Sequence, residues 1–158
     1  MKTSPRIETG QVAEGNLQKV YEGILNACKE VSEHMRYHTS NKIESSNDFG
    51  DVQLDMDVQT DSLIFEALRD TGVVYAGISE ERPQMTYLCP DGEYIVTFDP
   101  LDGSSVIDTN FAVGSIFAIW KRTPGKEDLE GLTGRDIVGA ALSCYGSRTN
   151  ILIYNEIG

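Results

Sequence analysis

One run of residues constrains this chain most: FDPLDGSS at residues 98–105. The residues from Tyr94 to Phe98 are rich in β-formers, so the run begins where a strand is expected to end. Pro100 fixes its own φ and biases Asp99 towards extended backbone, which restricts how the chain bends. The sequence therefore predicts a strand that ends at Asp99 and a tight turn directly after it.

The same run carries oxygen ligands. Asp99 and Asp102 can both reach one hard cation if the chain bends between them. Gly103, Ser104 and Ser105 then offer N–H groups and hydroxyls to a phosphate oxygen, above all if a helix begins there. An ordinary Asp-Gly turn has the same sequence, so the run alone leaves open whether it is a metal and phosphate site or a turn.

A second acidic site is the adjacent pair Glu80 and Glu81, which follows another apolar run. Such a pair, taken alone, is most often simply solvated. Residues 84–89 and 93–98 flank a Pro-Asp-Gly turn at 90–92, which predicts a hairpin between two strands. We expect this hairpin to bring the glutamates close to the aspartates of the first run.

A third acidic cluster lies within residues 47–61 and raises the alternative of a calcium loop. Three of the loop's ligand positions would be filled by Asp55, Asp57 and Glu66. However, Thr60 stands where the loop needs glycine, and Ser62 stands where an apolar residue is usual. Residues 62–69 instead predict a helix with Asp61 as its N-cap, in which Glu66 would be helical. The pattern disfavours calcium.

Apolar periodicity predicts the remaining elements. An amphipathic helix of about six turns carries its apolar stripe at Leu17, Val20, Ile24, Cys28, Val31 and Met35. Strands are expected at residues 73–78, 84–89, 93–98 and 111–120, the last of them buried on both faces. A charged loop is expected at 123–136, and a hairpin at 137–145 and 149–154. Residues 1–14 are expected to be a mobile N-terminal segment, followed by one domain at 15–158.

The histidines and cysteines favour neither a zinc site nor a disulfide framework. His34 and His38 lie four residues apart on the predicted helix, but no acidic residue completes a zinc motif around them. The cysteines are odd in number and widely spaced, which fits a reducing compartment: Cys28, Cys89 and Cys144.

Charge narrows the range of partners. Asp and Glu number 25 against 13 Lys and Arg, and the net charge of −12 argues against nucleic acid and anionic membranes. A phosphorylated substrate remains compatible, because bound cations invert the local field. No apolar run is long enough to span a bilayer and no leader peptide opens the chain. We expect a cytoplasmic protein; a plastid transit peptide removed from the sequence is the alternative.

Three motifs, in this order, resemble the sugar bisphosphatases of the lithium-sensitive, magnesium-dependent phosphatase superfamily. They are Gly50-Asp51 with Asp57 six residues after Asp51, then Ser79-Glu80-Glu81, then residues 98–105. Residues 106–108 read Val-Ile-Asp, where fructose-1,6-bisphosphatases usually have Asn-Ile-Asp. The segments that are instead similar to the sedoheptulose-1,7-bisphosphatase branch are 108–120, 132–136 and 145–149.

The resemblance implies a fold and a set of roles. The fold is the α+β, layered αβ sugar-phosphatase fold, in which N-terminal helices pack on a largely antiparallel or mixed sheet, here without the C-terminal αβ layer. The implied ligands of two or three Mg²⁺ ions, or of Mn²⁺ in their place, are Asp51, Glu80, Asp99, Asp102 and the Leu101 carbonyl. Asp57 and Glu81 would hold and deprotonate the attacking water. Contacts to the leaving phosphate would come from Asp102, Gly103, Ser104 and Ser105.

The implied activity is magnesium-dependent hydrolysis of the 1-phosphate of a sugar bisphosphate, with sedoheptulose 1,7-bisphosphate as the first expectation. Fructose-1,6-bisphosphate 1-phosphatase activity is one alternative, and a non-catalytic metal- or anion-binding, partner-dependent fragment is another. The resemblance also implies a homo-oligomer at full length. The apolar run 151–158 looks like a strand that needs neighbours on both edges, so we expect a truncated chain with exposed apolar sheet.

Overall fold

The computed structural model describes residues 15–37, 42–46, 52–125 and 128–155. The predicted mobile segment 1–14, His38 and the predicted metal ligand Asp51 lie outside the described residues. The elements are α1 (Asn16–Tyr37), β1 (Lys42–Ser46), β2 (Val52–Leu54), α2 (Asp55–Asp70), β3 (Val74–Ser79), β4 (Thr86–Tyr87), β5 (Tyr94–Asp102), η1 (Ser104–Thr109), β6 (Val113–Lys121), η2 (Gly134–Asp136), β7 (Ile137–Tyr145) and β8 (Thr149–Asn155).

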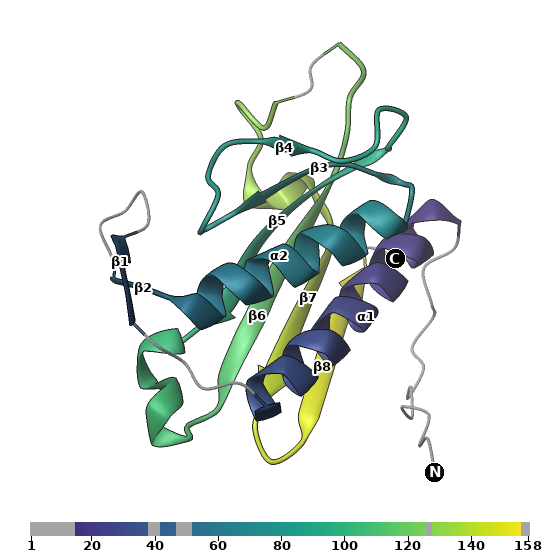
Figure 1. Ribbon diagram of the computed structural model, residues 1–158. Helices are drawn as coiled ribbons and strands as arrows, with labels where there is room; N and C mark the ends of the chain where they lie inside the picture. The colour runs from purple at the N-terminus through teal and green to yellow at the C-terminus, as the bar shows by residue number, and fades with distance from the viewer. Residues whose placement is uncertain (1–14, 38–41, 47–51, 126–127, 156–158) are drawn as a thin grey trace.

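Two helices pack side by side on one face of a six-stranded mixed sheet, as Figure 1 shows. The predicted stripe of α1 is confirmed, because Val20, Ile24, Cys28 and Val31 are fully buried against the sheet and α2. This arrangement, helices on a mixed sheet, confirms the fold class expected from the resemblance.

The strand order is β4-β3-β5-β6-β7-β8. Strands β5 to β8 form an antiparallel meander, and the predicted hairpin between β7 and β8 is confirmed. Strand β3 pairs with β5 in parallel and with β4 antiparallel. The mixed character of the sheet therefore comes from β3, inserted between β4 and β5.

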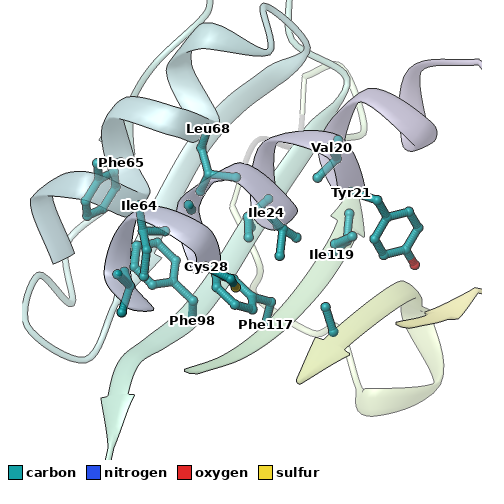
Figure 2. Packing of buried hydrophobic residues seen from close by; sticks show 14 of the residues in the cluster. Val20, Tyr21, Ile24, Cys28, Ile64, Phe65, Leu68, Phe98, Phe117 and Ile119 are labelled. Atoms are coloured by element: carbon teal, nitrogen blue, oxygen red, sulfur yellow. The ribbon is translucent and has the colours of Figure 1, made fainter. Parts of the chain in front are cut away.

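The core is aromatic beneath the centre of the sheet. Phe65 of α2 meets Phe98 of β5 edge-on, with ring centroids 5.1 Å apart, and Phe98 stacks on Phe117 of β6 at 5.9 Å (Figure 2). Burying one such ring stabilises the fold by roughly 1.5–3 kcal/mol. Because Phe98 directly precedes Asp99, the core fixes the start of the acidic run.

Four sequence predictions are wrong. The segments 84–89 and 93–98 do not form a hairpin, because short β4 pairs with β3 instead of β5. Strand β5 does not end at Asp99 but continues irregularly to Asp102. Helix α2 begins at Asp55, so Asp61 is a buried helix-interior residue and no N-cap. The predicted strand 111–120 is not buried on both faces, since Ile116 is 44% exposed.

The face of the sheet opposite the helices carries an exposed apolar row. Ile116, Leu142 and Leu152 are register partners across β6, β7 and β8, and they are 44%, 42% and 60% exposed. Among the described strands, β8 pairs only with β7. The expected exposed apolar sheet is therefore present; we call these three residues the apolar row. None of the helices in the described segments has the length and apolar character that a bilayer crossing requires.

Candidate metal and phosphate site

Parallel pairing of β3 and β5 brings the second and first acidic motifs together. Ser79 is the register partner of Phe98, and the N–H of Glu80 donates to the Phe98 carbonyl over 3.1 Å. Glu80, directly after β3, and Asp99, within β5, therefore lie at the same level of two neighbouring strands. The expectation that the two motifs meet is confirmed, although by parallel pairing and not by the predicted hairpin.

The Asp99 carboxylate is held by its own turn. The N–H of Leu101 donates to Asp99 Oδ1 over 3.0 Å, and the pairing of β5 with β6 is irregular between Asp99 and Asp102. Burial, then the charge of Glu80, raise the pKa of Asp99 to about 7, with Asp102 adding to the rise and the Leu101 N–H opposing it. The Asp99 carboxylate is thus close enough to Glu80 and to Asp102 to be repelled by both.

The turn after Asp102 is built as its sequence indicates. Gly103 has φ +84°, a left-handed conformation that favours glycine, and the 3-10 helix η1 starts at the next residue. Ser104 is half-buried and Ser105 is exposed. A short helix does begin at the serines, which was the condition attached to phosphate contact.

The two residues predicted to handle the attacking water come from different elements. Asp57 lies in the first turn of α2 and is 4% exposed. Glu81 follows β3 and is half-buried beside the exposed Glu80. Asp57 is thus held in the helix layer, and Glu81 lies in the turn that directly follows β3.

Two buried hydroxyl groups, of Ser115 and Tyr145, lie beside the backbone of Pro100 in the acidic run. The Ser115 hydroxyl donates to the Pro100 carbonyl over 2.7 Å and lies 2.8 Å from the Tyr145 hydroxyl. Ser115 is completely buried. The peptide between Asp99 and Leu101 is therefore tied to β6 and β7.

Replacing Ser115 with Ala is expected to lower the free energy of unfolding by about 1–3 kcal/mol, because the Pro100 carbonyl and the Tyr145 hydroxyl lose a buried partner. Urea unfolding measures this effect. Ser147→Ala, in the exposed turn between β7 and β8, is the matched control. A Ser115→Ala loss within about 0.5 kcal/mol of the control would contradict the role of this pair.

The donor set fits a hard cation in its chemistry. Carboxylate oxygens that repel one another, together with a carbonyl, are the ligands Mg²⁺ prefers, and the part of the site on β3 and β5 offers no nitrogen or sulfur. Within the described ranges, no three His, Cys, Asp or Glu side chains are already arranged to hold a metal ion.

A shallow depression of about 360 Å³ opens beside the carboxylates. Its lining includes Glu80 and Asp99 together with Ile116 and Ala118 of β6. The depression lies on the sheet face that the helices leave uncovered. It can admit a group that is polar at the carboxylates and less polar towards β6.

Two residues at this site were missed from the sequence. Arg82 pairs with the buried Asp61 of α2 across 2.7 Å, and Ser115 holds Pro100. The sequence does contain two signals for the pair. Arg82 directly follows Glu81, and Asp61 lies one helical turn after Asp57. Nothing local marks Ser115, whose contact spans 15 residues.

Helices on one face of a mixed sheet, with acidic residues gathered where β3 and β5 leave the core, define the class of layered αβ phosphatase domains. Residues 6–158 match the family model described as fructose-1-6-bisphosphatase, N-terminal domain, and the chain belongs to this family.

Two relatives illustrate the match in sequence. The chain is 36% identical to the class 1 fructose-1,6-bisphosphatase of Campylobacter curvus over 143 residues, which are 90% of this chain and 45% of that protein. It is 49% identical to the chloroplastic sedoheptulose-1,7-bisphosphatase of Spinacia oleracea over 109 residues, which are 68% of this chain and 27% of that protein.

Among solved structures, the holo form of Leishmania major fructose-1,6-bisphosphatase matches with a TM-score of 0.83 and 29% identity, covering 89% of this chain and 48% of that one. Relatives named bisphosphatases are phosphoric monoester hydrolases by name. The chain spans about half or less of the length of these relatives.

Proposed function

We propose that this chain carries the metal-binding and water-activating carboxylates of a magnesium-dependent sugar bisphosphatase. The observation that supports this most is the parallel pairing of β3 and β5, which places Glu80 beside the Asp99 run. The reaction is hydrolysis of the 1-phosphate of a sugar bisphosphate. Such esters hydrolyse extremely slowly without a catalyst, so charge neutralisation and an aligned water are both required.

The roles proposed for these residues are those that the family resemblance implies. Asp51, Glu80, Asp99, Asp102 and the Leu101 carbonyl are the proposed metal ligands. Bound Mg²⁺ would neutralise phosphoryl charge and make a nearby water more acidic. Asp57 and Glu81 hold that water and accept its proton, while Gly103, Ser104 and Ser105 donate to the departing phosphate.

Sedoheptulose 1,7-bisphosphate is the proposed substrate, converted to sedoheptulose 7-phosphate. The higher identity to the spinach sedoheptulose-1,7-bisphosphatase supports this choice, together with the motif at residues 108–120. Fructose 1,6-bisphosphate is the second candidate, supported by the longer match to the Campylobacter curvus enzyme. The remaining proposals are Mg²⁺ with Mn²⁺ as a substitute, a homo-oligomer at full length, a cytoplasmic location, and no nucleic acid or membrane partner.

Phosphate release by the full-length protein tests this function. Both sugar bisphosphates are supplied side by side, with Mg²⁺ and with a chelator. Release that needs Mg²⁺ and is faster for the sedoheptulose ester is the expected result. Faster release from the fructose ester would reverse the order of substrates, and no Mg²⁺-dependent release from either would favour a non-catalytic, partner-dependent role.

Metal affinity is expected to rise with pH up to about pH 7. Because the pKa of Asp99 is raised to about 7, the carboxyl carries a proton at lower pH, and that proton must leave before a cation binds. The apparent affinity for Mn²⁺ should therefore fall by up to about tenfold for each pH unit below 7. Mn²⁺ titration followed by electron paramagnetic resonance measures it; equal affinity at pH 5.5 and 7.5 would contradict the prediction.

A further inference from the structure

The two glutamates lie inside a turn that Arg82 closes at its far end. The N–H of Ser79 donates to the Arg82 carbonyl over 3.0 Å, and the N–H of Arg82 donates to the Ser79 hydroxyl over 2.9 Å. Glu80 and Glu81 are the two central residues of this turn. Their backbone is therefore fixed by bonds that begin and end on its first and last residues.

The Arg82 side chain then fastens this turn to helix α2. Its Nε lies 2.7 Å from Asp61 Oδ2, and its Nη2 donates to the Ser62 hydroxyl over 2.9 Å. The guanidinium carbon also lies 4.8 Å from the centre of the Phe65 ring. Three residues of one helix thus hold a single guanidinium, whose planar fork suits several directed contacts at once.

Asp61 is buried so deeply that this pairing is required. Its side chain is 1% exposed, whereas that of Arg82 is 41% exposed. Burial raises the pKa of Asp61, and the Ser79 hydroxyl and the charge of Arg82 oppose that rise. Removing the Arg82 cation would leave a buried carboxylate without its ion-pair partner, which is strongly destabilising.

The helix carries Asp57 one turn before Asp61, and both side chains are buried. Residues four apart on a helix lie on the same side of it. The contact between Arg82 and Asp61 therefore fixes how the Glu80–Glu81 turn lies relative to the helix turn that carries Asp57.

We propose that Arg82 is a positioning residue, which acts through Asp61 to hold the Glu80–Glu81 turn in register with Asp57. This inference rests on the proposed function, in which Glu80 binds metal and Glu81 shares the attacking water with Asp57. The contacts described for the Arg82 side chain are with helix α2, so we assign it no metal or substrate contact. Its effect is to keep carboxylates from two elements aligned.

The test uses the full-length protein and the variants Arg82→Met, Arg82→Lys and Asp61→Asn. Arg82→Met is expected to lower kcat about 10–100-fold and Mn²⁺ affinity about tenfold, as loss of an outer-shell partner does. Arg82→Lys keeps the charge beside Asp61 but not the fork, so an intermediate loss is expected. The double variant Arg82→Met/Asp61→Asn should be no worse than the worse single variant, because both remove the same pair.

Arg69→Met, on the exposed last turn of α2, is the matched control and should leave both measurements unchanged. Unaltered kcat and Mn²⁺ affinity in Arg82→Met, even with a lowered melting temperature, would overturn the inference. If Arg82→Met does not fold, wild-type kcat and Mn²⁺ affinity in Arg82→Lys would overturn it instead. A wild-type protein without phosphate release would refute the proposed function. The Mn²⁺ affinities of the variants would still test the positioning role of Arg82.

Discussion

The Asp99→Asn variant of the full-length protein is expected to lose at least about 10³-fold of its magnesium-dependent phosphate release, since a ligand carboxylate contributes several kcal/mol of charge stabilisation. The same change should leave the folded structure intact. Asn keeps an oxygen that can accept from the Leu101 N–H, and it removes the repulsion with Glu80 and Asp102 that raises the pKa of Asp99. Phosphate release and melting temperature of the metal-free protein measure the two effects.

Phosphate release should therefore fall while the melting temperature does not. At pH 8 the metal-free Asp99→Asn protein is expected to melt at the wild-type temperature or above it. Asp91→Asn, in the exposed turn before β5, removes one charge without touching either acidic motif and is the matched control. A variant at Asp99 that retained activity, or lost it only by unfolding, would count against the metal site.

Asp57→Asn is expected to lower kcat by about 10²–10⁴-fold, the usual contribution of a positioned general base. Mn²⁺ affinity should stay near the wild-type value, because Asp57 is assigned to the water and not to the metal. Single-turnover phosphate release and Mn²⁺ titration separate the two effects. This distinguishes Asp57 from Asp99, whose replacement should weaken both.

Asp70→Asn provides the comparison for Asp57, since it lies at the exposed end of the same helix. It should change neither kcat nor Mn²⁺ affinity. If Asp57→Asn weakened Mn²⁺ binding as strongly as Asp99→Asn, Asp57 would be a metal ligand and the assignment to the water would be wrong.

Local patterns predicted the elements that local contacts determine. The stripe of α1 and the hairpin of β7 and β8 depend on side-chain spacing and a short turn, and both are confirmed. The hairpin predicted around residues 90–92 failed because Gly92 packs directly against the backbone of Val74 and Tyr75, and β4 pairs with β3. Which strands pair in this part of the sheet depends on β3, which is distant in sequence from residues 90–92.

The site residues also divide into those that a local motif shows and those that only long-range contacts show. Glu80, Asp99 and Asp102 were visible as motifs, and the structure brings them within electrostatic reach of one another. The prediction of Asp61 as a helix N-cap is wrong, because α2 begins six residues earlier, at Asp55. The sequence alone does not show that Asp61 is buried and paired with Arg82. Ser115 has a generic sequence context, and only the fold shows that it supports Pro100.

The apolar row and the acidic depression have one residue in common, Ile116. A layer that shielded the whole row from water would therefore also reach the edge of this depression. The carboxylates proposed for the hydrolysis and the surface that contacts the sugar would then belong to separate parts. Relatives named for two different sugars match this same half of the architecture. Substrate choice could thus diverge in evolution through the covering layer while the chemistry beneath it stayed constant.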